Sequence, residues 1–184
     1  MNHLLKIIFV CFFTSPVPFL KAQTKEVQEI NWMTFEQAVE ASKKAPRKIF
    51  IDVYTDWCGW CKRMDATTFS HPEIVTYMNE KYYAVKLDAE MKDTVVFNGH
   101  TFVNPNPTVK RSSHQLAASL LEGKMSYPTT VYLDESINLL TSALPGYLTP
   151  TALEPILKFY GGNHHKTTSW EEFQKTFVSG IKAE

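Results

Sequence analysis

Residues 48–61 read Lys-Ile-Phe-Ile-Asp-Val-Tyr-Thr-Asp-Trp-Cys-Gly-Trp-Cys. Positions 48–54 are rich in β-branched and aromatic side chains with little alternation, which is typical of a central strand covered on both faces. Cys58 and Cys61 follow, separated by two residues. The stretch predicts a dithiol at the junction of a buried strand and a helix, where unpaired helix N–H groups favour negative charge on the first sulfur.

The length and composition suit one globular domain, since the chain has 184 residues and 44% of them are hydrophobic. Residues 1–22 are predicted to be a signal peptide, because His3 and Lys6 accompany an apolar stretch over 4–13 and Ala22 offers a cleavage point. A membrane anchor is the alternative, but the apolar stretch is short and prolines break it. We therefore expect export to the periplasm or full secretion, with no permanent membrane anchor.

The charge balance excludes one class of partner. Removing the leader takes away two lysines and no acid, so 17 basic residues face 19 acidic ones and the net charge is −2. That balance argues against a nucleic-acid partner. Export also suits the cysteine pair, because structural disulfides form outside the cytosol and must be made, corrected or reduced there.

Hydrophobic periodicity and capping signals predict one α/β domain over residues 23–160, followed over 161–184 by a linker and a C-terminal amphipathic helix. Capping boxes are expected to begin at Thr34, Ser70 and Ser169. Helices are expected over about 34–44, from the cysteine pair to about 69, and over 74–81, 113–123 and 149–160. Strands are expected over 48–54, 82–87 and 129–133. After a turn at 134–138, a further strand is expected up to about residue 143.

Two segments stand outside this pattern. Residues 89–111 contain Asn98-Gly99 and alternating asparagines and prolines, so we expect a loop or insertion with no regular structure beyond a turn at 93–97. In the tail, an apolar stripe between Trp170 and Ile181 is expected to pack back on the domain. The alternative for this stripe is an exposed face that binds a partner.

The order of elements between residues 32 and 160 resembles the thioredoxin fold. Asp52 stands six residues before Cys58, at the place of the buried acid of thioredoxins, and Lys86 falls where their partner lysine does. Pro128 lies in a segment similar to their cis-proline segment, and Gly146 is similar to the glycine before their last helix. The resemblance implies a central mixed sheet flanked by helices, with an insertion before the cis-proline strand and an extra C-terminal helix.

The flanks of the cysteine pair are similar to a narrower group. Residues 57–62, Trp-Cys-Gly-Trp-Cys-Lys, and residues 68–74, Thr-Phe-Ser-His-Pro-Glu-Ile, resemble exported thioredoxin-like proteins related to the C-terminal domain of DsbD-type thiol:disulfide interchange proteins. One departure concerns the two residues between the cysteines, where Gly59-Trp60 replaces the Gly-Pro of thioredoxin.

These observations assign expected roles. Cys58 is the candidate nucleophile because it is nearest the helix N-terminus, and Cys61, one turn further, is the resolving thiol. The resemblance implies that Asp52 handles the proton of Cys61 and that Lys86 tunes this acid by charge pairing. Structural alternatives are a strand-end Asp52 and a solvent-facing Lys86. Substrate contacts are expected at residues around the motif: Trp57, Gly59, Trp60, Tyr127 and Pro128.

The predicted function is an exported thiol–disulfide oxidoreductase of the protein-disulfide reductase type. A reductant or isomerising partner fits better than a strong oxidant, because strong oxidants usually carry a histidine between the cysteines. The expected partners are protein thiols and disulfides and an upstream electron donor, and the Cys58–Cys61 disulfide replaces any cofactor or metal. Three alternatives stay open: a permanent structural disulfide, a zinc site, and a non-catalytic binding module that uses residues 89–111 or the C-terminal helix.

Overall fold

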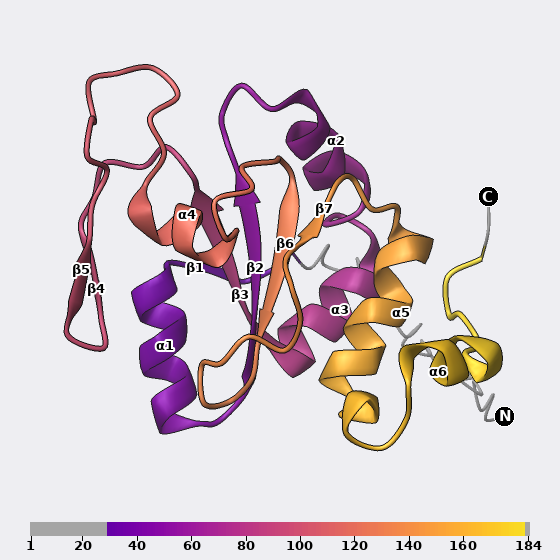
Figure 1. Ribbon diagram of the computed structural model, residues 1–184. Coiled ribbons are helices and arrows are strands. Elements are labelled where there is room, and N and C mark those ends of the chain that lie inside the picture. Colours follow the sequence, from indigo (N-terminus) through magenta and orange to yellow (C-terminus); the bar gives the residue numbers. More distant parts are fainter. Residues whose placement is uncertain (1–28, 183–184) are drawn as a thin grey trace, which may run out of the picture.

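The computed structural model describes residues 29–182, so the predicted signal peptide over 1–22 lies outside the described residues. A central sheet is covered by helices on both faces (Figure 1). Among the residues that the structure describes, no helix is both long enough and apolar enough to cross a membrane.

Five strands form the central sheet in the order β1–β3–β2–β6–β7. Both β1 and β2 run parallel to β3, whereas β6 pairs antiparallel with β2 and β7 antiparallel with β6. This mixed sheet confirms the predicted fold class. The bounds of the strands are Trp32–Met33 for β1, Lys48–Tyr54 for β2, Tyr82–Asp88 for β3, Thr129–Leu133 for β6 and Leu144–Pro145 for β7.

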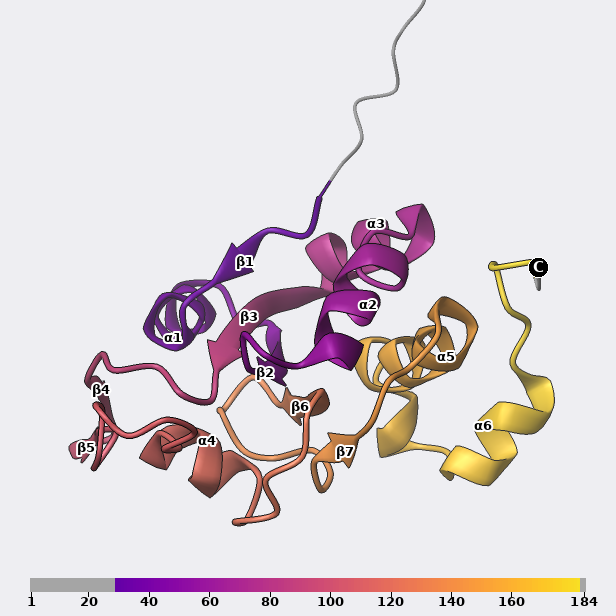
Figure 2. The ribbon, with the colours of Figure 1, turned by 90° about the horizontal axis from the view of Figure 1, so that it is seen from above.

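Strand β2 is buried on both faces because different helices cover each of them (Figures 1 and 2). Ile49, Ile51 and Val53 pack on the side of α1 and α4, while Phe50 packs on the side of α2, α3 and α5. Because side chains alternate along a strand, Asp52 shares the face of Phe50. The helices are α1 (Phe35–Lys44), α2 (Gly59–Thr67), α3 (Pro72–Lys81), α4 (Gln115–Leu120) and α5 (Pro150–Gly161).

The helix starts test the predicted capping boxes. Thr34 caps α1 as predicted: its hydroxyl accepts from the Gln37 N–H at 3.2 Å, and the Gln37 side chain accepts from the Thr34 N–H at 2.9 Å. The box at Ser70 is wrong, because His71 is the cap of α3 and its Nδ1 accepts from the Glu73 N–H. Pro72 suits the first helical position, so the residue just before it becomes the cap.

The segment over 89–111 contains a hairpin that we expected to be irregular. Strands β4 (Val95–Phe97) and β5 (His100–Phe102) pair antiparallel in a sheet of their own. Asn98 and Gly99 connect them with φ angles of 50° and 75°. Asparagine and glycine tolerate this left-handed backbone, which a two-residue hairpin turn requires, so Asn-Gly between apolar residues was the signal.

The expected strand up to residue 143 is wrong. Only Leu144–Pro145 pairs with β6, apart from an isolated bridge between Leu133 and Leu139. Ile137 adopts a φ of 65° in the preceding turn, and the Leu140 N–H still donates to the Tyr132 carbonyl at 2.9 Å. The chain leaves the edge of the sheet only after Leu140 and pairs again at residue 144.

The C-terminal segment packs against α5 through part of the predicted stripe. It contains a short 3₁₀ helix, η1 (His164–Lys166), and helix α6 (Trp170–Thr176), which Ser169 caps. Phe173 and Ile181 are buried, whereas Val178 is 85% exposed. The buried Glu154 of α5 accepts from the Gly180 N–H at 2.9 Å and from the Ser179 hydroxyl, so the tail is held to the domain.

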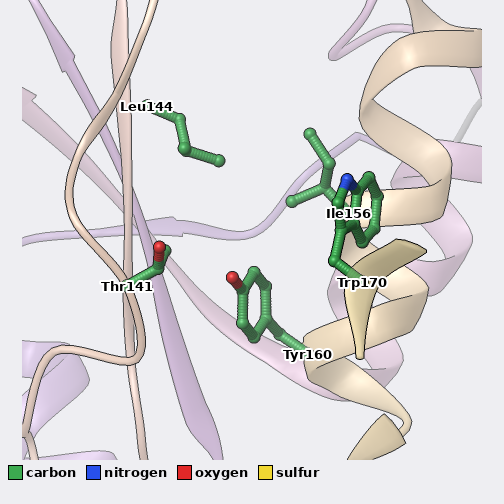
Figure 3. A pocket seen from close by; sticks show the side chains of 5 residues that line it. All are labelled: Thr141, Leu144, Ile156, Tyr160 and Trp170. Carbon is green, nitrogen blue, oxygen red and sulfur yellow. The ribbon is translucent and has the colours of Figure 1, made fainter. Parts of the chain in front are cut away.

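A pocket of about 310 Å³ lies where α6, α5 and the segment before β7 meet. Figure 3 shows Ile156, Tyr160 and Trp170 on one side and Thr141 and Leu144 on the other. The pocket is lined mainly by apolar atoms, and it lies beside the C-terminal helix rather than at the cysteine pair.

Candidate active site

The cysteine pair forms a disulfide at the start of α2. The two sulfurs are 2.10 Å apart, and Cys58 is the N-cap residue of the helix. Its Sγ accepts a hydrogen bond from the Cys61 N–H at 3.0 Å. Cys58 exposes 5% of its surface and Cys61 1%. The first sulfur therefore lies at the positive end of the helix, as the sequence predicted, and is the more accessible of the two.

Asp52 is buried on β2, with only 1% of its surface exposed. Its Oδ2 accepts from the Lys86 ammonium at 2.7 Å, while Oδ1 has no hydrogen-bond partner among the described residues. Burial raises the pKa of Asp52 from 3.8 to about 6, and the attraction of Lys86 opposes this rise. The carboxyl group can therefore exchange a proton near neutral pH.

Lys86 joins two acids beneath the site. It is the direct partner of Asp52 in the β2–β3 ladder, and its ammonium also contacts the Asp65 carboxylate of α2. Sequence reasoning missed Asp65, although its position four residues after Cys61 places both on one face of the helix. Three aromatic rings lie 5.0–5.1 Å from the ammonium: those of Trp32, Tyr54 and Phe69.

The predicted cis-proline segment lies next to the motif. The Tyr127-Pro128 peptide bond is cis, and the Pro128 carbonyl accepts from the Gly146 N–H at 2.8 Å. Thr129 then enters β6 beside the end of β2. The rings of Tyr127 and Trp57 meet edge to face, with centroids 5.9 Å apart. Strand pairing thus brings residues about 70 positions apart to one end of the sheet.

Trp57 is half exposed and held by the insertion. Its indole N–H donates to the Glu90 carboxylate at 2.7 Å, and the guanidinium carbon of Arg111 lies 4.7 Å from its ring centroid. Neither Glu90 nor Arg111 was predicted as a site residue, and no local signal marks them, because they reach Trp57 only through the folded insertion.

Trp60, between the two cysteines, is 55% exposed and has other neighbours than Trp57. Its ring lies 5.5 Å from that of Tyr147, and the Arg63 guanidinium lies 5.4 Å from the Trp60 centroid. Gly59 faces open space, since a Cβ there would meet nothing within 4 Å. Both tryptophans therefore offer exposed aromatic surface near the disulfide, each next to an arginine.

The fold and the site together define the class of thioredoxin-like proteins with a Cys-x-x-Cys disulfide. A model of the Thioredox_DsbH family, described as a protein of unknown function, DUF255, matches residues 12–176. This chain belongs to that family.

Two curated relatives are similar to part of this chain. The chain is 31% identical over 75 residues to spermatogenesis-associated protein 20 of Rattus norvegicus, which covers 40% of this chain and 10% of that protein. It is 26% identical over 80 residues to the thiol:disulfide interchange protein DsbD of Pseudoalteromonas atlantica. That match covers 43% of this chain and 14% of DsbD. It thus spans at most about a seventh of either relative.

The solved structure described as DsbH oxidoreductase superposes with a TM-score of 0.53 at 16% identity, covering 78% of this chain and 92% of that one. This likeness shows the thioredoxin fold. Together with the family match and the DsbD similarity, it confirms the resemblance to DsbD-related thioredoxin-like proteins.

Proposed function

We propose that this protein is an exported thiol–disulfide oxidoreductase that reduces or isomerises disulfides of other proteins. One observation carries the proposal: Cys58 Sγ caps α2 and accepts the Cys61 N–H at 3.0 Å. In the reduced protein, the same N–H and the helix dipole stabilise a thiolate at Cys58. Because the thiolate is the attacking species in disulfide exchange, Cys58 is the nucleophile.

The proposed exchange proceeds in two steps. The Cys58 thiolate attacks one sulfur of a substrate disulfide, which forms a mixed disulfide and releases the other substrate sulfur as a thiolate that takes up a proton. The Cys61 thiolate then attacks Cys58 Sγ, which releases the second substrate thiol and closes the Cys58–Cys61 disulfide. The substrate gains two electrons and the protein loses two, so a dithiol donor must reduce the pair before the next cycle.

Asp52 is proposed to take the proton of Cys61 before the second step. Its pKa of about 6 leaves it mostly ionised at neutral pH, and its Oδ1 has no hydrogen-bond partner among the described residues. Lys86 keeps the carboxyl group ionisable despite burial, since its ammonium lies 2.7 Å from Oδ2. Lys86 is therefore a positioning residue that acts through Asp52.

The substrate surface is proposed to form around the disulfide. Trp57 and Trp60 offer exposed aromatic area on either side of Cys58, and Tyr127 and Pro128 border the Trp57 side. Aromatic rings supply large contact area at low cost in conformational entropy, which suits varied polypeptide substrates. Gly59 leaves the space above the helix start open.

Export and the reducing direction complete the proposal. The apolar leader over 1–22 supports export, and a location outside the cytosol provides protein disulfides as substrates. Gly59 and Trp60 stand between the cysteines in place of the histidine typical of strong oxidants. A reductase or isomerase fed by an upstream donor therefore fits better than an oxidase.

Single-cysteine variants of the protein test the enzymatic proposal. In an assay where a small thiol regenerates the reduced cysteine pair, Cys58→Ser is expected to abolish the reduction of insulin disulfides. Cys61→Ser is expected to accumulate mixed disulfides with exported proteins. These are visible on a non-reducing gel as bands of higher mass that disappear when the sample is treated with a reductant. If Cys61→Ser captures no protein in cells and Cys58→Ser reduces insulin as fast as the wild type, the proposal is wrong.

A non-catalytic binding module is the second candidate function. Val96 and Val109 of the insertion expose 61% and 60% of their surface, so both apolar side chains are available for contact with a partner. A binding module predicts that Cys58→Ser keeps its biological role, whereas Val96→Ser together with Val109→Ser loses it. An oxidoreductase predicts the reverse: Cys58→Ser loses the biological role and the double valine variant keeps it.

A further inference from the structure

A pocket of about 520 Å³ opens beside Trp60, between α2, the segment after β7 and the C-terminal tail. Arg63 and Lys182 line it, together with His71, Tyr147 and threonines. The His71 Nδ1 accepts from a backbone N–H, so in the neutral ring Nε2 carries the proton and can donate. The charged and titratable lining therefore consists of the cations Arg63 and Lys182, the ring of His71 and the phenol of Tyr147.

The two cations of this pocket are not neutralised. Within residues 29–182, neither Arg63 nor Lys182 forms an ion pair, and no carboxylate is among the lining residues. Glu73 lies near the tail but is exposed and outside the lining. The buried Glu154 is already paired with Lys158 at 2.6 Å. An incoming carboxylate would thus meet two positive charges that pair with no carboxylate of residues 29–182.

The pocket is connected to the cysteine pair through α2. Trp60, Arg63 and Thr67 lie at helical spacing on one face, and the Arg63 guanidinium stacks over Trp60 at 5.4 Å and over Tyr147 at 5.6 Å. Arg63 is five residues after Cys58, about 7.5 Å along the helix axis. An extended polypeptide advances about 3.3 Å per residue, so about two residues separate these points in a bound substrate.

The surroundings of Trp57 are charged differently. Trp57 donates to the Glu90 carboxylate, and Asp88 lies next to Glu90, accepting its backbone N–H at 2.9 Å. Arg111 is the cation that faces Trp57 there. The Trp57 side therefore carries charges of both signs, whereas the charged side chains that line the pocket on the Trp60 side, among the described residues, are both positive.

We propose that this pocket binds an aspartate or glutamate side chain located two or three residues from the reactive cysteine of a substrate polypeptide. The inference rests on the function proposed above and defines the substrate class of the same site. Like charge is disfavoured in the pocket, so a lysine at that substrate position slows the reaction.

Matched peptide disulfides test the inference with the reduced protein. Three peptides carry Glu, Gln or Lys two and three residues from the cysteine, and their exchange rates are followed by tryptophan fluorescence. The Glu peptide is expected to react about 5- to 10-fold faster than the Lys peptide, with a ratio that falls in about 0.5 M salt. Arg63→Gln and Lys182→Gln are each expected to reduce this ratio severalfold.

Two further variants show where the preference arises. Lys124→Gln removes the same charge from an exposed site after α4, on the other face of the sheet, and is expected to leave the ratio unchanged. If the Glu and Lys peptides react equally fast with the wild type, the inference is overturned. It is also overturned if Arg111→Gln lowers the ratio as much as Arg63→Gln. Failure of all three peptides, Gln included, overturns the proposed oxidoreductase function itself.

Discussion

The Lys86 ammonium lies 2.7 Å from Oδ2 of the buried Asp52, and the two residues are direct neighbours in the parallel ladder of β2 and β3. This pair places an ionisable carboxyl group beneath the dithiol helix with its charge only partly compensated, since burial outweighs the lysine and raises the pKa of Asp52 to about 6. Several measurable properties depend on this relationship.

Asp52 is expected to make the folded protein less stable as the pH rises from about 4 to 6. In the folded state Asp52 keeps its proton up to a pKa of about 6, whereas in the unfolded state it loses the proton near 3.8. The free energy of unfolding therefore falls as the pH rises through this window and stays constant above it. The difference corresponds to about 3 kcal/mol of unfolding free energy.

Asp52→Asn removes this penalty. It is expected to be about 1–3 kcal/mol more stable than the wild type at about pH 8, with the gain vanishing near pH 4. The gain in unfolding free energy stays below the full penalty of Asp52 because Lys86 loses one of its two carboxylate partners. Urea denaturation of both oxidised proteins across this pH range measures the effect. An Asn variant that is less stable at pH 8 would show that the buried charge is well compensated.

Lys86→Met is expected to raise the pKa of Asp52 further, by at least about one unit, because the nearest opposite charge is lost. If Asp52 must be ionised to take the proton of Cys61, the acid limb of the pH–rate profile for disulfide exchange moves upward by the same amount. Lys86→Arg keeps the positive charge and serves as the matched control. An unchanged profile in Lys86→Met would separate Asp52 from the exchange reaction.

Glu90→Ala is expected to weaken substrate binding by releasing Trp57. The indole N–H loses its acceptor at 2.7 Å, so the half-exposed ring samples more orientations and KM for protein disulfides rises about 3- to 10-fold. Glu90→Gln retains an acceptor oxygen and is expected to stay within about 2-fold of the wild type. Steady-state insulin reduction compares the three proteins. Equal KM values would mean that Trp57 is positioned by Tyr127 and Arg111 alone.

Glu154→Ala is expected to release the C-terminal tail. The side chain is buried and accepts from Gly180, Ser179 and Lys158, so its loss leaves three donors to find water and costs about 1–3 kcal/mol of unfolding free energy. Faster amide exchange at Ile181 and along α5 would show that the effect is local. Ser179→Ala removes one donor only and is expected to cost less.

The sequence predicted the core of this fold because its signals are local. The apolar run of β2, the Cys58 cap and the Thr34 capping box each depend on residues within a few positions. The Asn98-Gly99 turn was equally local, and the hairpin around it was predictable from that pair. Ser70 failed as a cap because Pro72 fixes the first helical position, which is also a local effect.

The surroundings of the disulfide were less predictable because distant segments supply them. Glu90 and Arg111 reach Trp57 from the insertion, and Tyr147 reaches Trp60 from the segment after β7. Such contacts follow from strand order and loop path, which propensities do not encode. The contact between Lys86 and Asp52 was expected only through the resemblance to thioredoxins, since an alternating strand also puts lysines on solvent faces.

The reduction potential of the Cys58–Cys61 pair separates a redox-active disulfide from a structural one. The mature protein would be equilibrated in graded thiol buffers, and its free thiols counted by alkylation, with exchange against a protein disulfide measured in parallel. A reductase or isomerase predicts a potential between about −270 and −180 mV together with rapid exchange. A pair that stays oxidised below about −300 mV and exchanges with nothing would be a structural disulfide and would contradict the proposed function.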